Sequence, residues 1–250
     1  MNSPAPLQPM LDKLERYVRF SDEDRAAMLA LPHTLRTVEA SKYIVREGDR
    51  AENACLLRSG FAFRHKTVGD GGRQIVAIHM KGDLVDLQNS LLRTADHSVQ
   101  ALTESEIALI PRRAIIDLCA RNAVVAQAMW LDTLVDGSVF REWIANVGRR
   151  DARSRTAHVL CEFAVRQEFA GLGERGEYEL PMTQEQLADV LGLTPVHVNR
   201  TLKSLEADGL ISRNKRAVTI GSWEKLRAAG DFSPAYLHLE LIEDGSASRP

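Results

Sequence analysis

Side chains that bind phosphates and base edges gather between residues 183 and 216 of this 250-residue sequence. Arg200 has the planar fork of N–H donors that matches guanine, and the amide of Asn199 can read a base or a phosphate. Residues 196–216 hold five Lys or Arg residues against two acids, a balance that suits a sugar–phosphate backbone. These residue types predict contact with double-stranded DNA. The candidate DNA-binding residues are Thr183, Gln184, Thr194, Val196, His197, Asn199, Arg200, Lys203, Arg213 and Lys215.

Two short helices around a tight turn must position these side chains. Residues 184–190 are good helix formers, and Gly192 permits the positive φ that ends a helix. Thr194 suits an N-cap, and Pro195 fits the first helical position, where no amide hydrogen is needed. The pattern predicts a helix-turn-helix whose second helix can lie in a major groove.

The second predicted helix has an apolar face and a polar face. Val198, Leu202 and Leu205 recur at helical spacing and are expected to be buried, which turns Arg200 outward. Residues 210–220 then have the pattern of strand, basic turn and strand, which is typical of a wing beside the DNA backbone. The alternative is a purely structural corner between two helices, which does not require cations on the outward face.

The outward residues have expected partners on DNA. Arg200 is expected to contact guanine, and such a contact contributes about 1–3 kcal/mol of discrimination between bases. Thr183 and Gln184 begin the first helix, where backbone amides and a hydroxyl suit a phosphate. The cations expected to contact phosphates are Lys203, Arg213 and Lys215.

Composition is that of an ordinary globular protein. The chain is 44% hydrophobic and 26% charged with a net charge of −2, so its cations are concentrated locally. Cys55, Cys119 and Cys161 are odd in number and widely spaced, which argues against a disulfide framework. The sequence has neither an apolar run long enough to span a membrane nor a recognisable signal peptide. We therefore expect a cytoplasmic protein with no membrane partner.

Residues 34–110 have the pattern of short strands. Their apolar runs are separated by turn sequences such as Glu47-Gly-Asp49 and Lys81-Gly-Asp83, which predicts an antiparallel β-roll, jelly-roll-like, in an α+β protein. Before the strands, residues 1–10 contain three prolines and predict a disordered lead-in. Residues 11–31 predict helix, with Ser21 and Asp24 capping a second short helix.

A long helix is predicted over residues 122–148, with Asn122 as its cap. One row of its residues recurs at alternating spacings of four and three, close to the seam of a coiled coil. We expect this seam to form a homodimer, and the alternative is that both faces of the helix pack within one chain. Gly148 and the arginines after it predict a hinge. The predicted dimer seam consists of Val124, Ala128, Leu131 and Val135.

These parts, in this order, resemble the CRP/FNR family of bacterial transcription regulators. The resemblance is most specific in Met182-Thr-Gln-Glu-Gln-Leu-Ala188, Gly192-Leu-Thr194 and Val198-Asn-Arg-Thr-Leu-Lys203. It implies a cyclic-nucleotide-binding-like sensor domain, a homodimer on a near-palindromic operator, and RNA polymerase as a partner. The expected domains are a β-roll sensor at 11–121, a dimerisation helix at 122–148, a winged helix-turn-helix at 149–230 and a C-terminal tail at 231–250.

The sequence departs from the family where its members bind cyclic AMP. The Gly-Glu pair that holds the ribose aligns with Asp86-Leu87, and the Arg-Ser pair that holds the phosphate aligns with His97-Ser98. His97 lacks the fixed charge and the fork of an arginine, and the carboxylate of Asp86 would repel a phosphate. We therefore expect an effector other than cyclic AMP, or none. The corresponding effector pocket consists of Val85, Asp86, Leu87, His97 and Ser98.

The other sensing groups of the family find weak support. An iron–sulfur sensor needs four thiolates, mostly near the N-terminus, whereas this chain has three cysteines and none before Cys55. A haem stays open as an alternative, although isolated histidines are more often surface or core residues. We predict no metal ion and no cofactor, and the effector is unknown. The histidines that keep the haem alternative open are His33, His65, His79 and His97.

The recognition helix departs from the family as well. Arg200 matches the family's base-reading arginine, but the glutamate position holds Val196. A valine cannot accept a hydrogen bond from cytosine, although it can touch a thymine methyl group. The operator is therefore expected to diverge from the usual half-site of the family.

Two other classes of function have less support. A small-molecule receptor that acts through protein contacts would use the winged domain for docking, but the outward cations favour DNA. The sequence contains no Gly-rich phosphate loop, no His-Glu-x-x-His, no Gly-x-Ser-x-Gly and no Cys-x-x-Cys. We therefore predict no catalytic residues and no enzyme.

Overall fold

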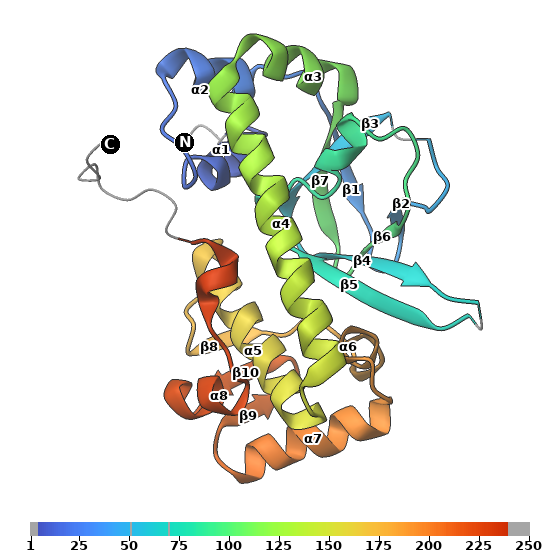
Figure 1. Cartoon of the computed structure of the whole chain (residues 1–250), viewed down its shortest axis with the longest axis vertical. Helices are drawn as coiled ribbons and strands as arrows, with labels where there is room; N and C mark the ends of the chain where they lie inside the picture. Colours follow the sequence, from blue (N-terminus) through green and yellow to red (C-terminus); the bar gives the residue numbers. More distant parts are fainter. Residues whose placement is uncertain (1–4, 51, 70, 240–250) are drawn as a thin grey trace. The chain divides into compact units, whose positions relative to one another are not determined.

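The structure of the chain is a computed structural model that divides into two compact units (Figure 1). The first unit holds the chain up to Ala62, His79–Gly137 and the described residues from Leu237, and the second holds Phe63–Ile78 and Ser138–Tyr236. The long helix contributes its first part to one unit and its last part to the other. The structure describes residues 5–50, 52–69 and 71–239.

Antiparallel strands form the centre of the first unit, as the Gly-Asp turns predict. One sheet has the order β1-β7-β3, with Thr34 opposite Leu109 at one end of the β1–β7 pair and Val38 opposite Ser105 at the other. Strand β2 pairs with β6, and the apolar pattern of the sequence does not reveal β6 as a strand. The elements are α1 (Gln8–Leu14), α2 (Asp22–Leu29), β1 (Thr34–Val38), β2 (Tyr43–Val45), β3 (Asn53–Ser59), the 3-10 turn η1 (Leu87–Ser90), β6 (Ser98–Ala101), β7 (Ser105–Pro111), α3 (Arg112–Arg121) and the first part of α4 (Ala123–Arg149).

The core of the first unit joins its helices to its sheet. Apolar side chains of α1, α2, α3 and α4 pack in one cluster with side chains from β3 and β7. This burial supplies most of the stabilisation of such a domain, at about 25 cal/mol per Å² of apolar surface. The fully buried members include Leu7, Met10, Leu14, Met28, Leu56, Ala108, Ile110, Val125 and Ala128.

The N-terminal region is more ordered than the prolines suggest. Helix α1 begins at Gln8, with Pro9 in its first turn, where the missing amide hydrogen removes no helical hydrogen bond. Leu7 and Met10 are fully buried and anchor this turn to the core. The predicted disordered lead-in over residues 1–10 is therefore wrong for residues 5–10, and residues 1–4 lie outside the described residues.

The capping prediction for α2 is confirmed. The hydroxyl of Ser21 accepts from the amide of Asp24 at 3.1 Å, and the carboxylate of Asp24 accepts from the amide of Ser21 at 3.1 Å. This reciprocal pair satisfies two backbone donors that a helix start leaves open. Asn122, the predicted cap of the long helix, donates its side-chain amide to Asp24 at 3.0 Å and so ties the start of α4 to α2.

Helix α4 turns three of the four residues of the predicted dimer seam toward the core of its own chain. Ala128 is fully buried, and Leu131 and Val135 pack against the core of the first unit. The seam prediction therefore requires correction, because these three face their own chain while Val124 stays 37% exposed. Both faces of α4 are apolar, and spacing alone does not say which one packs inside. The large apolar side chains on the exposed face include Trp130 and Ile144, which are 68% and 73% exposed.

The hinge lies slightly beyond the predicted glycine. Helix α4 continues through Gly148 to Arg149, and the next helix, α5, begins at Ala152. Asp151 caps α5, because its carboxylate accepts from the amide of Ser154 at 2.8 Å. The chain therefore changes direction at Arg150 and Asp151 rather than at Gly148.

The second unit contains a β-hairpin and a winged helix-turn-helix. Strands β8, β10 and β9 form an antiparallel sheet in that order, with Val218 opposite Tyr178 on one side and Arg213 on the other. Strands β9 and β10 are the wing that residues 210–220 predict. The elements are the hairpin β4 (Ala62–Thr67) and β5 (Arg73–His79), the last part of α4, α5 (Ala152–Phe169), β8 (Glu177–Glu179), α6 (Gln184–Leu191), α7 (Pro195–Ala207), β9 (Ile211–Asn214), β10 (Ala217–Ile220), α8 (Trp223–Ala229) and the 3-10 turn η2 (Pro234–Leu237).

Helix α5 is the centre of the second unit. It contacts α6, α7, α8 and β8, and it is buried over most of its length. The hydroxyl of Tyr178 on β8 donates to the carbonyl of Leu160 on α5 at 3.0 Å. Among the described residues of the whole chain, no helix is long and apolar enough to cross a lipid bilayer.

Candidate nucleic-acid interface

The first helix of the motif, α6, starts at a complete capping box. The hydroxyl of Thr183 accepts from the amide of Gln186 at 3.1 Å, and the side-chain carbonyl of Gln186 accepts from the amide of Thr183 at 2.8 Å. Gln184 follows as the first helical residue and is exposed. The helix start therefore presents a polar, exposed end of the kind that binds a phosphate.

The turn between the helices forms as its residue types predict. Gly192 has φ 62° and ψ 39°, the left-handed conformation that favours glycine, and it ends α6. Thr194 then caps α7, because its hydroxyl accepts from the amide of His197 at 3.3 Å. Pro195 is the first residue of the helix.

Helix α7 presents the predicted polar face. Val198, Leu202 and Leu205 are buried, with at most 1% of each residue exposed. Thr201 is also buried, and its hydroxyl donates to the carbonyl of His197 at 2.9 Å. The opposite face is exposed, with His197 and Asn199 half-buried at its margin. Its exposed residues include Val196, which is 81% exposed, Arg200 and Lys203.

Side chains outside the motif fix the end of α6, and sequence reasoning missed them. Gln74 of β5 donates its amide to the carbonyl of Asp189 at 2.7 Å and to that of Val190 at 3.2 Å. Arg155 of α5 donates to the carbonyl of Leu191 at 2.5 Å. Because the last carbonyls of a helix have no partner within it, these donors stabilise the turn. Arg73, beside Gln74, also forms an ion pair with Asp189 at 2.7 Å.

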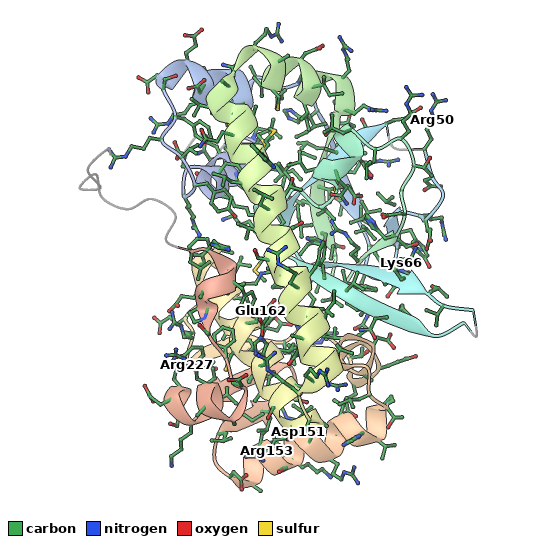
Figure 2. All side chains as sticks on the ribbon, in the orientation of Figure 1. Arg50, Lys66, Asp151, Arg153, Glu162 and Arg227 are labelled. Carbon is green, nitrogen blue, oxygen red and sulfur yellow. The ribbon has the colours of Figure 1, made fainter. Side chains whose placement is uncertain are left out.

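A second group of contacts fixes the end of α7. Arg153, labelled with Asp151 in Figure 2, lies in the first turn of α5. Its guanidinium donates to the hydroxyl of Ser204 at 2.7 Å and pairs with the carboxylate of Asp208 at 2.6 Å. The cluster of arginines after Gly148 thus holds the recognition helix as well as forming the hinge. The cluster of arginines was visible in the sequence, but the partners of Arg153, which lie 51 and 55 positions later, were not.

The wing cations differ in what they contact. Arg213 donates twice to Glu206 of α7, at 3.0 Å for each bond, which braces the wing against the recognition helix. Arg216 lies 3.8 Å from the carboxylate of Glu179. Lys215 is exposed at the turn between the two strands, with φ 55°. Of the predicted phosphate-binding cations, Arg213 is therefore held within the domain.

A small exposed cationic surface results. Within the part of the chain that the structure describes, Arg200, Lys203 and Lys215 form no ion pair with an acid. Their charge is therefore available to a partner outside the domain. The arrangement of a polar helix face, a capped helix start and an exposed wing lysine suits one side of a duplex.

Two protein families match parts of the chain. The Crp-like helix-turn-helix domain matches residues 154–229, and the cyclic nucleotide-binding domain matches residues 35–122. The chain is 29% identical over 217 residues to the transcriptional activator protein FnrL of Cereibacter sphaeroides, over 85% of this chain and 87% of that one. It is 30% identical over 162 residues to the nitrogen fixation regulation protein FixK of Azorhizobium caulinodans, over 65% and 64% of the two chains. The solved structure of FixK2 from Bradyrhizobium japonicum matches with a TM-score of 0.74 and 25% identity, over 80% of this chain and 98% of that one.

The chain belongs to the CRP/FNR family of transcription regulators. It is a DNA-binding regulator with an N-terminal jelly-roll-like β-domain and a C-terminal helix-turn-helix, as the sequence predicts. The family consists of transcription regulators rather than enzymes.

The residues of the predicted effector pocket of this CRP/FNR protein are buried and make polar contacts with neighbouring side chains and backbone. Asp86 is fully buried, and one of its oxygens lies 2.8 Å from Nε2 of His97. The other ring nitrogen of His97 lies 2.6 Å from the carboxylate of Asp96. Ser98 accepts from the amide of Glu47 at 3.0 Å. Val85 and Leu87 are buried beside them, so all five predicted pocket residues are buried.

The three cysteines lie in settings that do not favour thiolates. Burial raises the pKa of the Cys55 thiol far above its usual value and that of Cys161 to about 12. Burial also raises the pKa of Cys119, which is half-buried with its sulfur 3.5 Å from that of Met129. Because thiolates are the reactive and metal-binding form, these three residues suit packing. Among the described residues, no cluster of three or more His, Cys, Asp or Glu could hold a metal ion.

Proposed function

We propose that this regulator acts as a homodimer that reads a near-palindromic DNA operator with α7 of each subunit. The observation that carries the proposal is the exposed face of α7, where Arg200 and Lys203 project from a helix whose other face is buried. A recognition helix needs this combination of a fixed orientation and free donors. DNA is found in the cytoplasm of a bacterium, which is the compartment this function requires.

The contacts with DNA divide into two classes. Arg200 would contact guanine and Val196 a thymine methyl group, while His197 and Asn199 at the margin of the face would read a base or a phosphate. Phosphates would be held at the capped starts of both helices and by the exposed lysines. The residues assigned to phosphates are Thr183, Gln184, Thr194, Lys203 and Lys215, with Arg213 bracing the wing.

The dimer would form through the exposed face of α4. Trp130 is 68% exposed, and Ile144 follows 14 residues later on the same face of the helix, with an exposure of 73%. Large apolar side chains at such exposure are typical of an interface. A two-fold axis along this face would place two α7 helices for half-sites one helical turn apart, about 34 Å. RNA polymerase would be the further partner of such a dimer at a promoter.

An effector that binds the β-domain would be a molecule other than cyclic AMP. The buried contact between His97 and Asp86 supports this, because it places a carboxylate where a cyclic phosphate would require donors. The β-domain over residues 11–121 would then respond to another effector, or regulation would depend on the amount of protein.

Replacing Arg200 by alanine tests the base-reading assignment. The variant is expected to lose about 10- to 100-fold of its preference for operator over random DNA, because one bidentate guanine contact discriminates by about 1–3 kcal/mol. Fluorescence anisotropy on a labelled operator, selected from promoter fragments, measures both affinities. Arg36→Ala, at an exposed arginine of β1 in the other unit, is the matched control.

Two results would contradict the proposal. An unchanged ratio of operator to random affinity in Arg200→Ala would remove the guanine contact. A parent protein whose DNA affinity does not fall steeply with added salt would instead favour the receptor alternative, because phosphate contacts release counterions.

A further inference from the structure

The chain continues beyond the matched helix-turn-helix region, which ends at residue 229, and folds back onto α5. At Gly230 the backbone lies directly against this helix. A Cβ atom there would lie 2.6 Å from the backbone nitrogen of His158, so only glycine fits. The carbonyl of Gly230 lies 3.1 Å from Nδ1 of the His158 ring. We name residues 230–236 the C-terminal strap.

Aromatic contacts hold the strap in place. Phe232 is buried, with its ring edge-on to His158 of α5 at 5.2 Å and to Trp223 of α8 at 6.1 Å between centroids. The ring of Tyr236 stacks with that of His158, at 5.8 Å between centroids and 15° between planes. Arg227 of α8, labelled in Figure 2, donates to the carbonyl of Phe232 at 2.9 Å. The strap is therefore part of the packed second unit.

The strap meets α4 and α5 at one buried carboxylate, Glu162, which Figure 2 labels on α5. Only 2% of Glu162 is exposed. The hydroxyl of Tyr236 donates to it at 2.7 Å, and the indole of Trp143 on α4 donates at 2.9 Å. Burial raises the pKa of Tyr236 well above its usual value, so the hydroxyl keeps the proton that it donates. Arg166 of α5 also pairs with this carboxylate, at 3.4 Å. Because a buried carboxylate requires such donors, Glu162 depends on Tyr236 and Trp143 as well as on the arginine of its own helix.

A second link joins the strap to the hinge itself. Arg150, between α4 and α5, donates to the carbonyl of Asp231 at 3.3 Å and pairs with its carboxylate at 3.2 Å. The same guanidinium pairs with Glu142 of α4 at 2.7 Å. The strap thus contacts the hinge residue and α5 directly, and it is linked to the last part of α4 through Glu162 and Arg150. The arrangement of these three parts sets the hinge angle.

We propose that the C-terminal strap fixes the hinge between α4 and α5, with Tyr236 as a positioning residue that acts through Glu162. This inference rests on the proposed function, because the hinge angle matters only when two α7 helices must fit one operator. A fixed hinge lowers the conformational entropy that operator binding would otherwise cost. Its loss should weaken binding to a whole operator and leave binding to an isolated half-site unchanged.

Two tyrosine-to-phenylalanine variants of the full chain separate this role from general stability. Tyr236→Phe removes only the hydroxyl, which donates to Glu162 and also lies 3.1 Å from Nε2 of His158. Tyr178→Phe removes a hydroxyl of the same unit that is more deeply buried than that of Tyr236 and that donates to the carbonyl of Leu160, without contacting α4 or the strap in the described part of the chain. A hydrogen bond to a charged group corresponds to a change of about tenfold or more in an equilibrium.

The first measurement uses no DNA. Trypsin should cleave after Arg149 and Arg150 about tenfold faster in Tyr236→Phe than in Tyr178→Phe, because opening of the hinge limits cleavage. Cleavage after Arg113, an exposed residue of the first unit, is the internal reference, since global unfolding would accelerate both sites. The second measurement is affinity, which should fall about tenfold for the whole operator in Tyr236→Phe and not for a half-site.

Equal rates of hinge cleavage in the two variants would contradict the proposal that the strap fixes the hinge. Equal losses of affinity for operator and half-site would also overturn it, because they would indicate damage to the DNA-binding surface. A parent protein that binds no DNA would overturn the proposed function instead, and the cleavage ratio would still decide whether the strap fixes the hinge.

Discussion

Replacing Lys13 by methionine is expected to destabilise the first unit by about 3–5 kcal/mol, which is the usual cost of removing one partner from a buried ion pair. The ammonium of Lys13 lies 2.9 Å from the carboxylate of Asp83 and 2.7 Å from that of Asp132. Asp132 is 4% exposed, and Tyr17 donates to it at 3.3 Å. Without the lysine, two buried carboxylates would lose the cation that they share, and the imidazole of His79, 3.7 Å from Asp83, would be left beside only one of them. Urea unfolding, followed by circular dichroism, measures the loss.

The pH dependence of this loss has a definite sign. Burial raises the pKa of Asp132 to about 6, against the attraction of Lys13, and removal of the cation should raise it further. A carboxyl group with a raised pKa in the folded state stabilises the fold at low pH, and this contribution is lost as the pH rises through that pKa. The deficit of Lys13→Met should therefore be largest at pH 7 and shrink toward pH 5. Lys81→Met, the same change at an exposed lysine, is the control, and an equal effect there would contradict the argument.

The recognition motif could be predicted from sequence because its signals are local. Gly192, Thr194 and Pro195 each restrict the backbone within one turn of their own position, and no distant partner can reverse that restriction. The same holds for Ser21 and Asp24, whose capping box depends only on residues three apart. Local chemistry thus fixed the positions of the helix starts and of the polar face of α7.

Contacts between distant residues could not be predicted in this way. Lys13 pairs with residues 70 and 119 positions later, and Gln74 caps a helix that ends more than 110 positions later. Nothing in the neighbourhood of either residue indicates its partner. Composition did not identify Glu162 either, because a single glutamate within an apolar helix resembles a solvated residue until its donors are known.

The predicted dimer seam shows a different limit of prediction from sequence. Helix α4 is apolar on two faces, and a heptad row describes a face without saying what covers it. The row with the more regular spacing, which includes Ala128, packs on the chain's own core. The less regular row, with Trp130, remains exposed. Burial of a helix face is decided by the strands and helices around it, which lie elsewhere in the sequence.

Replacing Trp130 by glutamate is expected to dissociate the dimer and to lower operator affinity by at least about 100-fold. An isologous interface repeats each contact about its two-fold axis, so one substitution places two carboxylates in an apolar contact. Desolvating such charges costs several kcal/mol, and 2.7 kcal/mol already corresponds to about 100-fold. Light scattering during gel filtration measures the oligomeric state, and anisotropy measures affinity. Leu172→Glu, at an exposed leucine in the loop after α5, is the matched control.

A second variant distinguishes this interface from the seam that the heptad spacing predicts. Val135 packs against the core of the first unit, so Val135→Glu should lower the free energy of unfolding, as urea titration would detect, before it affects assembly. Trp130 is mostly exposed in the single chain, so its replacement should leave the unfolding of the monomer nearly unchanged. If Trp130→Glu stays dimeric, the exposed face of α4 is not the interface. The opposite pattern, in which Val135→Glu alone dissociates a stable fold, would restore the heptad seam and require α4 to detach from its own core when the dimer forms.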